Sequence, residues 1–183
     1  MIERLSRLPS PLVHRRRAPL VLVFFGLLVF AATRWFHPVP GIGNPDIGGI
    51  LYSADTINLG LLPYRDTVDV KQPGSFFIVA AVFRISRSVV ALQVAFVAWL
   101  LIGAVAVWRA ARALYPDEAR PLTAPSVATA VYLLTAGAFD LNYAAWMMVP
   151  YAWSFALLCE GLRGGRLYQH VLAGAFAALA YTF

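Results

Sequence analysis

Long apolar segments bounded by arginines leave this chain of 183 residues few possible folds. A helix needs about 20 mostly apolar residues to cross the roughly 30 Å hydrocarbon core of a bilayer. Hydrophobic residues make up 60% of the chain and charged residues 13%, which is more apolar than soluble domains usually are. The sequence therefore predicts an all-α, polytopic transmembrane helical protein with about five spans. The predicted spans are 18–36, 88–108, 123–139, 143–160 and 168–183.

The arginines indicate how these spans are oriented. Residues 1–17 are rich in arginine, and further arginines lie in the connections 109–122 and 161–167. Basic connections favour the cytoplasmic side, so we expect all three to face the cytoplasm of a cell with an inner (plasma) membrane. Topology accounts in this way for the net charge of +6, and we predict no nucleic-acid partner. The apolar segments that follow favour a retained first span over a cleaved signal peptide.

A shorter apolar segment, 74–84, falls below the roughly 17 residues that a span requires. If it crossed the membrane, both later basic connections would face outward, so we predict an interfacial or re-entrant helix there. Residues 37–87 then form one large external loop, and such long loops usually have a function. A loosely amphipathic pattern predicts another interfacial helix at 47–59, which Gly60 would end.

The end of this loop, residues 63–74, concentrates charge in an otherwise apolar chain. It contains Lys71, the only lysine, close to Arg65, Asp66 and Asp69. Lysine and arginine both bind phosphate groups, so this stretch suits a phosphate at the membrane surface. The alternative is that the carboxylates are solvated or form exposed ion pairs, which contribute about 1 kcal/mol or less.

A further acid, Asp46, follows the Pro/Gly-rich stretch 41–45 and precedes Gly48 and Gly49. This setting predicts irregular backbone at Asp46, from which a carboxylate could reach into a cleft. The alternative is that Asp46 caps the helix predicted at 47–59, a role that aspartate often fills. The lone Cys159 lies in an apolar run, where a buried small hydrophobe is expected.

Together these motifs resemble the polytopic glycosyltransferases of the GT-C fold. The closest likeness is to the family-39-like enzymes and the bacterial members of the dolichyl-phosphate-mannose protein mannosyltransferase superfamily. Those proteins have an external first loop with an early Asp, then Gly-x-x-Pro-Tyr-Arg-Asp and Asp-x-Lys-x-Pro-Gly before an apolar helix. The residues that carry the resemblance are Asp46, Tyr52, Ala54, Gly60, Pro63, Tyr64, Arg65, Asp66, Asp69, Lys71, Pro73 and Gly74.

The resemblance implies transfer of a sugar, with inversion, from a polyprenyl-phosphate-sugar donor to a glycan, lipid or protein acceptor outside the inner membrane. Asp46 would deprotonate the acceptor hydroxyl, while Lys71 and Arg65 would hold the lipid phosphate. The further substrate-binding residues that it implies are Tyr52, Tyr64, Asp66, Asp69 and Asp140. For Asp140, in the next external loop, an acid at the membrane interface is the alternative.

The chain also departs from the family pattern. Ile47 stands where a glutamate commonly follows the early Asp, Gln72 where the family often has proline, and Gln93 where an arginine is frequent. Family members are much longer, so we expect this chain to correspond to the N-terminal part of an enzyme and to have weak or no activity alone. The chain is expected to end within the last apolar helix, predicted at 168–183.

Two other classes of protein remain open from the sequence. A non-catalytic membrane scaffold or accessory subunit would need none of the loop acids. A component of a polyprenyl-lipid transporter would place polar residues within its spans. The apolar segments after residue 88 contain few polar residues, which weighs against this class. No metal-ligand spacing is recognisable, so we predict no cofactor.

Overall fold

The computed structural model describes residues 24, 26–28, 31, 45–67, 72–116, 123–138 and 141–183, and in these residues it is all-helical, without strands. The all-α class predicted from the sequence is therefore confirmed, and the polytopic arrangement with about five spans stays a prediction. Residues 24, 26–28 and 31 are helical, and the rest of the predicted first span lies outside the described residues. The longer helices are α2 (Pro45–Asn58), α3 (Gly74–Ile85), α4 (Val89–Leu114), α5 (Thr123–Ala138), α6 (Tyr143–Gly164) and α7 (Leu167–Ala180).

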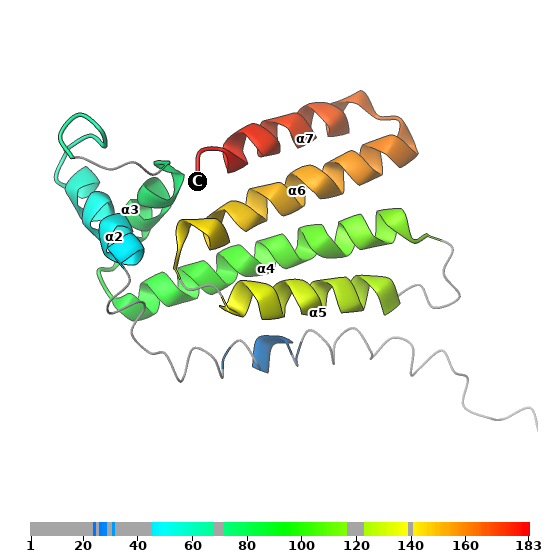
Figure 1. Cartoon of the computed structure of the whole chain (residues 1–183), viewed down its shortest axis with the longest axis horizontal. Helices are drawn as coiled ribbons and strands as arrows, with labels where there is room; N and C mark the ends of the chain where they lie inside the picture. Colours follow the sequence, from blue (N-terminus) through cyan, green and yellow to red (C-terminus); the bar gives the residue numbers. More distant parts are fainter. Residues whose placement is uncertain are drawn as a thin grey trace, which may run out of the picture.

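The helices α4 to α7 lie side by side as a bundle (Figure 1). Both α5 and α6 pack against α4, and α7 packs against α6. The pair α2 and α3 pack on each other at the end of the bundle where α4 begins. Because α5 and α7 run back toward that end, α6 is parallel to α4, and the turns after α4 and α6 lie together at the opposite end (Figure 1).

Local capping chemistry determines where several helices begin and end. The Ser88 hydroxyl accepts a hydrogen bond from the Val90 amide at 3.2 Å, and Asn142 Oδ1 accepts one from the Ala144 amide at 3.2 Å. Each side chain satisfies one of the free amides at a helix start. Gly165, with φ 64°, ends α6 in the left-handed conformation that glycine adopts readily.

The helix boundaries differ from the predicted ones where charged residues continue a helix. α4 was expected to end at residue 108 but continues to Leu114, because alanine and arginine are both strong helix formers. Arg109 and Arg112 therefore lie on the last turns of α4 and not in a connection. At the other side of the bundle, α7 ends at Ala180, and Phe183 folds back into the core with 4% of its surface exposed.

A proline inside α6 creates the main cross-link to α4. Pro150 has no amide hydrogen, so the carbonyl of Trp146, four residues earlier, lacks its helical donor. The indole Nε1 of Trp99 on α4 donates to that carbonyl at 2.9 Å. Trp146 itself is fully buried, and Phe96 packs edge-on against its ring at 5.0 Å between centroids. Trp99 on α4 therefore supplies the hydrogen bond that Pro150 removes from α6.

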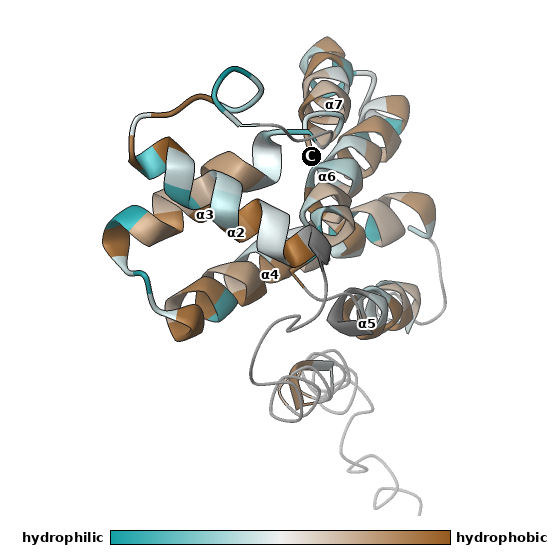
Figure 2. Cartoon of the chain, turned by 60° about the vertical axis from the view of Figure 1, so that its left-hand side comes forward, coloured by the Kyte–Doolittle hydropathy of each residue, from teal (hydrophilic) through white to brown (hydrophobic). Residues whose placement is uncertain are grey.

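Among the described helices, α4 alone has both the length and the apolarity to cross a membrane. The helix α3 is shorter, as predicted for the segment 74–84, and α7 and most of α5 are also short apolar helices. α6 has sufficient length, but Pro150 and Glu160 interrupt its apolar sequence. In Figure 2 hydrophobic residues line every helix, and hydrophilic residues gather in the connection between α2 and α3.

Candidate functional site

The predicted site residues that the structure describes lie at the α2–α3 end of the molecule. Tyr52 is on α2 with 64% of its surface exposed, and Tyr64, Arg65 and Asp66 lie together in the connection from α2 to α3. For Asp46 the backbone is described and the side chain is not. The remaining predicted site residues, Asp69, Lys71 and Asp140, lie outside the described residues.

Asp46 lies in a different backbone setting from the one predicted. α2 begins at Pro45, so Asp46 is in the first turn of the helix and is neither in an irregular loop nor at the capping position. Proline has a fixed φ that suits the first helical position and has no amide to leave unsatisfied, which explains the earlier start. A carboxylate in the first turn also interacts favourably with the helix dipole.

The connection after α2 folds into a compact turn, residues 61–67. The Leu62 amide donates to the Asp66 carboxylate at 2.8 Å, and the Asp66 amide donates to the Leu62 carbonyl at 3.0 Å. The Tyr64 amide donates to the Thr67 carbonyl at 3.1 Å. Tyr64 adopts φ 66°, a left-handed conformation that a bulky residue rarely adopts without compensation. The turn thus presents a strained tyrosine, 51% exposed, at its tip.

Asp66 is the residue that organises this turn. Arg65 donates from Nη2 to Asp66 Oδ2 at 2.7 Å and from Nε to Oδ1 at 3.0 Å, in a bidentate pair. This hydrogen bond, the Leu62 amide and the charge of Arg65 together hold the pKa of Asp66 below its ordinary value. The pair is exposed, so it contributes little stability and the guanidinium remains accessible.

Polar contacts between α2 and α3 fix the base of the turn. The Asn58 amide group donates to the Ala80 carbonyl at 3.0 Å, and Arg84 Nε donates to Asn58 Oδ1 at 3.0 Å. Arg87 pairs with Asp55 at 2.8 Å. These contacts hold the two helices together while the turn projects beyond them.

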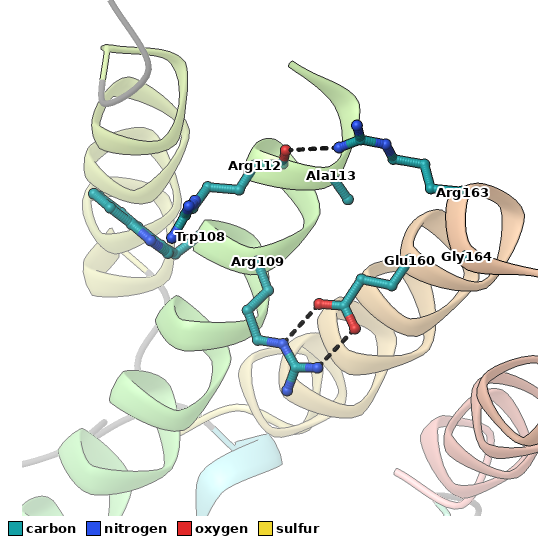
Figure 3. Close-up of a pocket in the computed structure, with 7 residues that line it drawn as sticks. All are labelled: Trp108, Arg109, Arg112, Ala113, Glu160, Arg163 and Gly164. Carbon is teal, nitrogen blue, oxygen red and sulfur yellow. Dashed lines mark hydrogen bonds and ion pairs between the residues drawn. The ribbon is translucent and has the colours of Figure 1, made fainter. Parts of the chain in front are cut away.

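At the opposite end of the bundle the structure brings together a cluster that the sequence analysis did not identify. Arg109 on α4 binds Glu160 on α6 through two hydrogen bonds of 2.8 and 2.7 Å (Figure 3). Its guanidinium also lies 5.0 Å from the centre of the Trp153 ring. Gln169 on α7 also donates to Glu160, at 3.3 Å. No signal in the sequence identifies this cluster, because the pairing of Arg109 with Glu160, 51 residues apart, depends on how α4 and α6 pack.

This cluster borders two cavities. One, of about 510 Å³, opens among the arginines and is lined by Trp108, Arg109, Arg112, Ala113, Glu160, Arg163 and Gly164 (Figure 3). The other, of about 490 Å³, is an apolar groove between α4, α6 and α7 and also has Arg109 in its wall. Among the described residues, no group of three or more His, Cys, Asp or Glu side chains could hold a metal ion.

Comparison with protein-family models, with curated proteins and with solved structures finds no significant match for this chain.

Proposed function

We propose that this chain is the N-terminal part of a polytopic inner-membrane glycosyltransferase that moves a sugar from a polyprenyl-phosphate carrier to an acceptor outside the cell membrane. The observation that carries the proposal is the turn at residues 61–67, with a strained, half-exposed Tyr64 beside an accessible Arg65. Backbone strain of this kind is concentrated at functional sites, where the surrounding contacts compensate for its cost.

The arrangement of charge supports the membrane topology in the proposal. The turn and the helices α2 and α3 are at one end of the bundle, and Arg109, Arg112 and Arg163 are at the other. With the basic end in the cytoplasm, the turn faces outward, where α2 and α3 lie along the membrane surface. The bundle α4 to α7 then crosses the membrane, and α4 is the described helix that has both the length and the apolarity for a span.

The proposed roles follow from the chemistry of the residues. Asp46 is the base that takes the proton of the acceptor hydroxyl, and Lys71 neutralises the phosphate as the glycosidic bond breaks. Arg65 assists Lys71 by exchanging its exposed contact with Asp66 for the phosphate, an exchange that costs little because exposed ion pairs are weak. Tyr52, Tyr64, Asp69 and Asp140 contact the donor or the acceptor.

Sugar transfer in membranes that contain this chain, joined to any downstream coding sequence, tests the proposal. Asp46→Asn and Lys71→Ala should abolish transfer at unchanged membrane abundance. Asp55→Asn is the matched control, because Asp55 is also an acid on α2 but pairs with Arg87. Full transfer in Asp46→Asn, or equal loss in Asp55→Asn, would show that Asp46 is not the base.

A non-catalytic accessory subunit is the second candidate. One specific observation favours it: four of the described charges at the α2–α3 end form two ion pairs, Arg65 with Asp66 and Arg87 with Asp55. A subunit of this kind would need the turn only as a contact surface. Replacing Asp46 and Lys71 together would then leave the partner's activity intact, whereas deleting residues 61–67 would weaken assembly of the complex.

A further inference from the structure

The cavity among the arginines at the end of α4 and α6 has a surplus of positive charge. It is lined by Arg109, Arg112 and Arg163 against a single carboxylate, Glu160. Glu160 is already bound to Arg109, so its charge is balanced by that residue. Arg112 and Arg163 both line this cavity, with Arg112 extending toward Trp108 and Arg163 reaching over from α6, and no described carboxylate pairs with either of them (Figure 3). The pocket therefore suits an anion with several acceptor oxygens.

Arg163 is held in place without losing its capacity to bind an anion. Its Nη1 donates to the main-chain carbonyl of Arg112 at 3.4 Å, which holds the guanidinium over the end of α4. A guanidinium has five N–H donors, so most of them remain for a ligand. Phosphate oxygens match this planar, forked arrangement of donors.

The adjoining groove is apolar and extends from this pocket along the bundle. Its floor is α6, with Val149, Trp153 and Leu157, and its walls are α4 and α7. The groove extends along α4 from Trp99 to Arg109, which at 1.5 Å per residue corresponds to about 15 Å. This length is about half of the roughly 30 Å hydrocarbon core, that is, one leaflet.

An apolar groove one leaflet long that ends in a basic pocket matches one amphiphile, and we propose that it binds an anionic phospholipid. The phosphate group lies in the pocket on the guanidinium of Arg163, with the charge of Arg112 in the same pocket wall, and one acyl chain lies along α6 between α4 and α7. Arg109 is in the walls of both cavities, so the two adjoin at this residue. The site requires the bundle to be embedded in a membrane, but it requires no sugar transfer.

The test is lipid retention by the purified full-length chain in detergent, measured by native mass spectrometry with phosphatidylglycerol or phosphatidylcholine added. The wild-type chain should retain phosphatidylglycerol preferentially. Arg112→Ala or Arg163→Ala should each reduce that preference about fivefold, as expected for one basic residue at an anionic surface. Arg166→Ala is the matched control, because Arg166 is at the same end of the bundle but outside both cavity walls.

Leu172→Trp tests the groove separately, since a larger side chain in its wall should exclude the acyl chain and lower retention of both lipids. If Arg112→Ala and Arg166→Ala lower the preference for phosphatidylglycerol equally, the preference comes from general surface charge and the proposed site is wrong. Unchanged retention in Leu172→Trp would overturn the groove. Competition by inorganic phosphate alone would also contradict the proposal. So would polyprenyl phosphate that is retained more strongly than phosphatidylglycerol and is lost in Arg112→Ala and Arg163→Ala.

Discussion

Replacing Trp99 by phenylalanine should destabilise the bundle mainly because the main-chain carbonyl of Trp146 loses its hydrogen-bond donor. In the native chain Pro150 leaves the Trp146 carbonyl without its helical donor, and Trp99 Nε1 supplies the replacement at 2.9 Å. Phenylalanine has no donor, so in Trp99→Phe the carbonyl stays unsatisfied beside a fully buried side chain. An unsatisfied buried acceptor costs about 1–3 kcal/mol, in addition to the loss of packing from the smaller ring.

A double-mutant cycle with Pro150→Ala isolates this cost. Alanine at this position restores an amide that donates to the Trp146 carbonyl within α6, so the donor from Trp99 becomes dispensable. The packing loss is the same in both backgrounds and cancels. Trp99→Phe should therefore cost about 1–3 kcal/mol less in the Pro150→Ala background than in the native one.

The assay is reversible unfolding of the full-length chain in mixed micelles of a mild detergent and dodecyl sulfate, followed by ellipticity, which is insensitive to the lost tryptophan. Trp108→Phe is the matched control, because it makes the same substitution on the same helix away from Pro150. Its cost should be independent of the Pro150→Ala background. If Trp99→Phe also costs the same free energy in both backgrounds, the proline and the tryptophan are not coupled and the account of α6 is wrong.

Three further outcomes can be measured. Gly103→Ala should be about 1–3 kcal/mol less stable in the same assay than Gly174→Ala. A methyl group at Gly103 meets the hydroxyl of Tyr132 on α5, whereas Gly174 faces open space. Equal stability of the two variants would contradict the close contact. Asp66→Asn should speed hydrogen exchange of the Leu62 amide at neutral pH, because it replaces the carboxylate that accepts from this amide. In the native chain the protection of this amide should be complete above the ordinary aspartate pKa of about 4 and should be lost as pH falls through the lowered pKa of Asp66. Protection retained at neutral pH in the variant would exclude Asp66 as the acceptor. Glu160→Gln should lower the free energy of unfolding by about 1–2 kcal/mol, between exposed and buried ion pairs, since the side chains of this pair are 41% and 20% exposed; no measurable change would mean that the pair is solvent-screened.

The helices and the charge-dense turn were predictable because their signals are local. Apolar runs with capping residues such as Ser88 and Asn142 determine helices whatever their neighbours are. A short apolar helix was also expected at 74–84, and the structure has α3 there as Gly74–Ile85, while its interfacial placement stays a prediction. The buried state of Cys159 followed from its apolar surroundings and is confirmed.

The errors arose where tertiary packing, or a single residue's backbone preference, decided the outcome. Asp46 was expected outside a helix, yet the fixed φ of Pro45 starts α2 earlier. Glu160 is the last residue of the predicted span 143–160 and was assigned no role, but packing of α4 beside α6 makes it the partner of Arg109. No local pattern predicts a contact across 51 residues, because it depends on the register of two helices.

The sequence by itself therefore determined an all-helical chain, the approximate extent of its helices and the separation of basic connections from the charged stretch at residues 63–74. Hydrophobic periodicity and arginine placement act over a few residues and need no partner helix. Only the tertiary structure decided that Trp99 completes the backbone of α6, that Tyr64 adopts a left-handed conformation and that a basic pocket adjoins an apolar groove. The contact of Trp99 and the two adjoining cavities depend on which side chains face each other once helices pack, and the conformation of Tyr64 depends on the hydrogen bonds that close the folded turn.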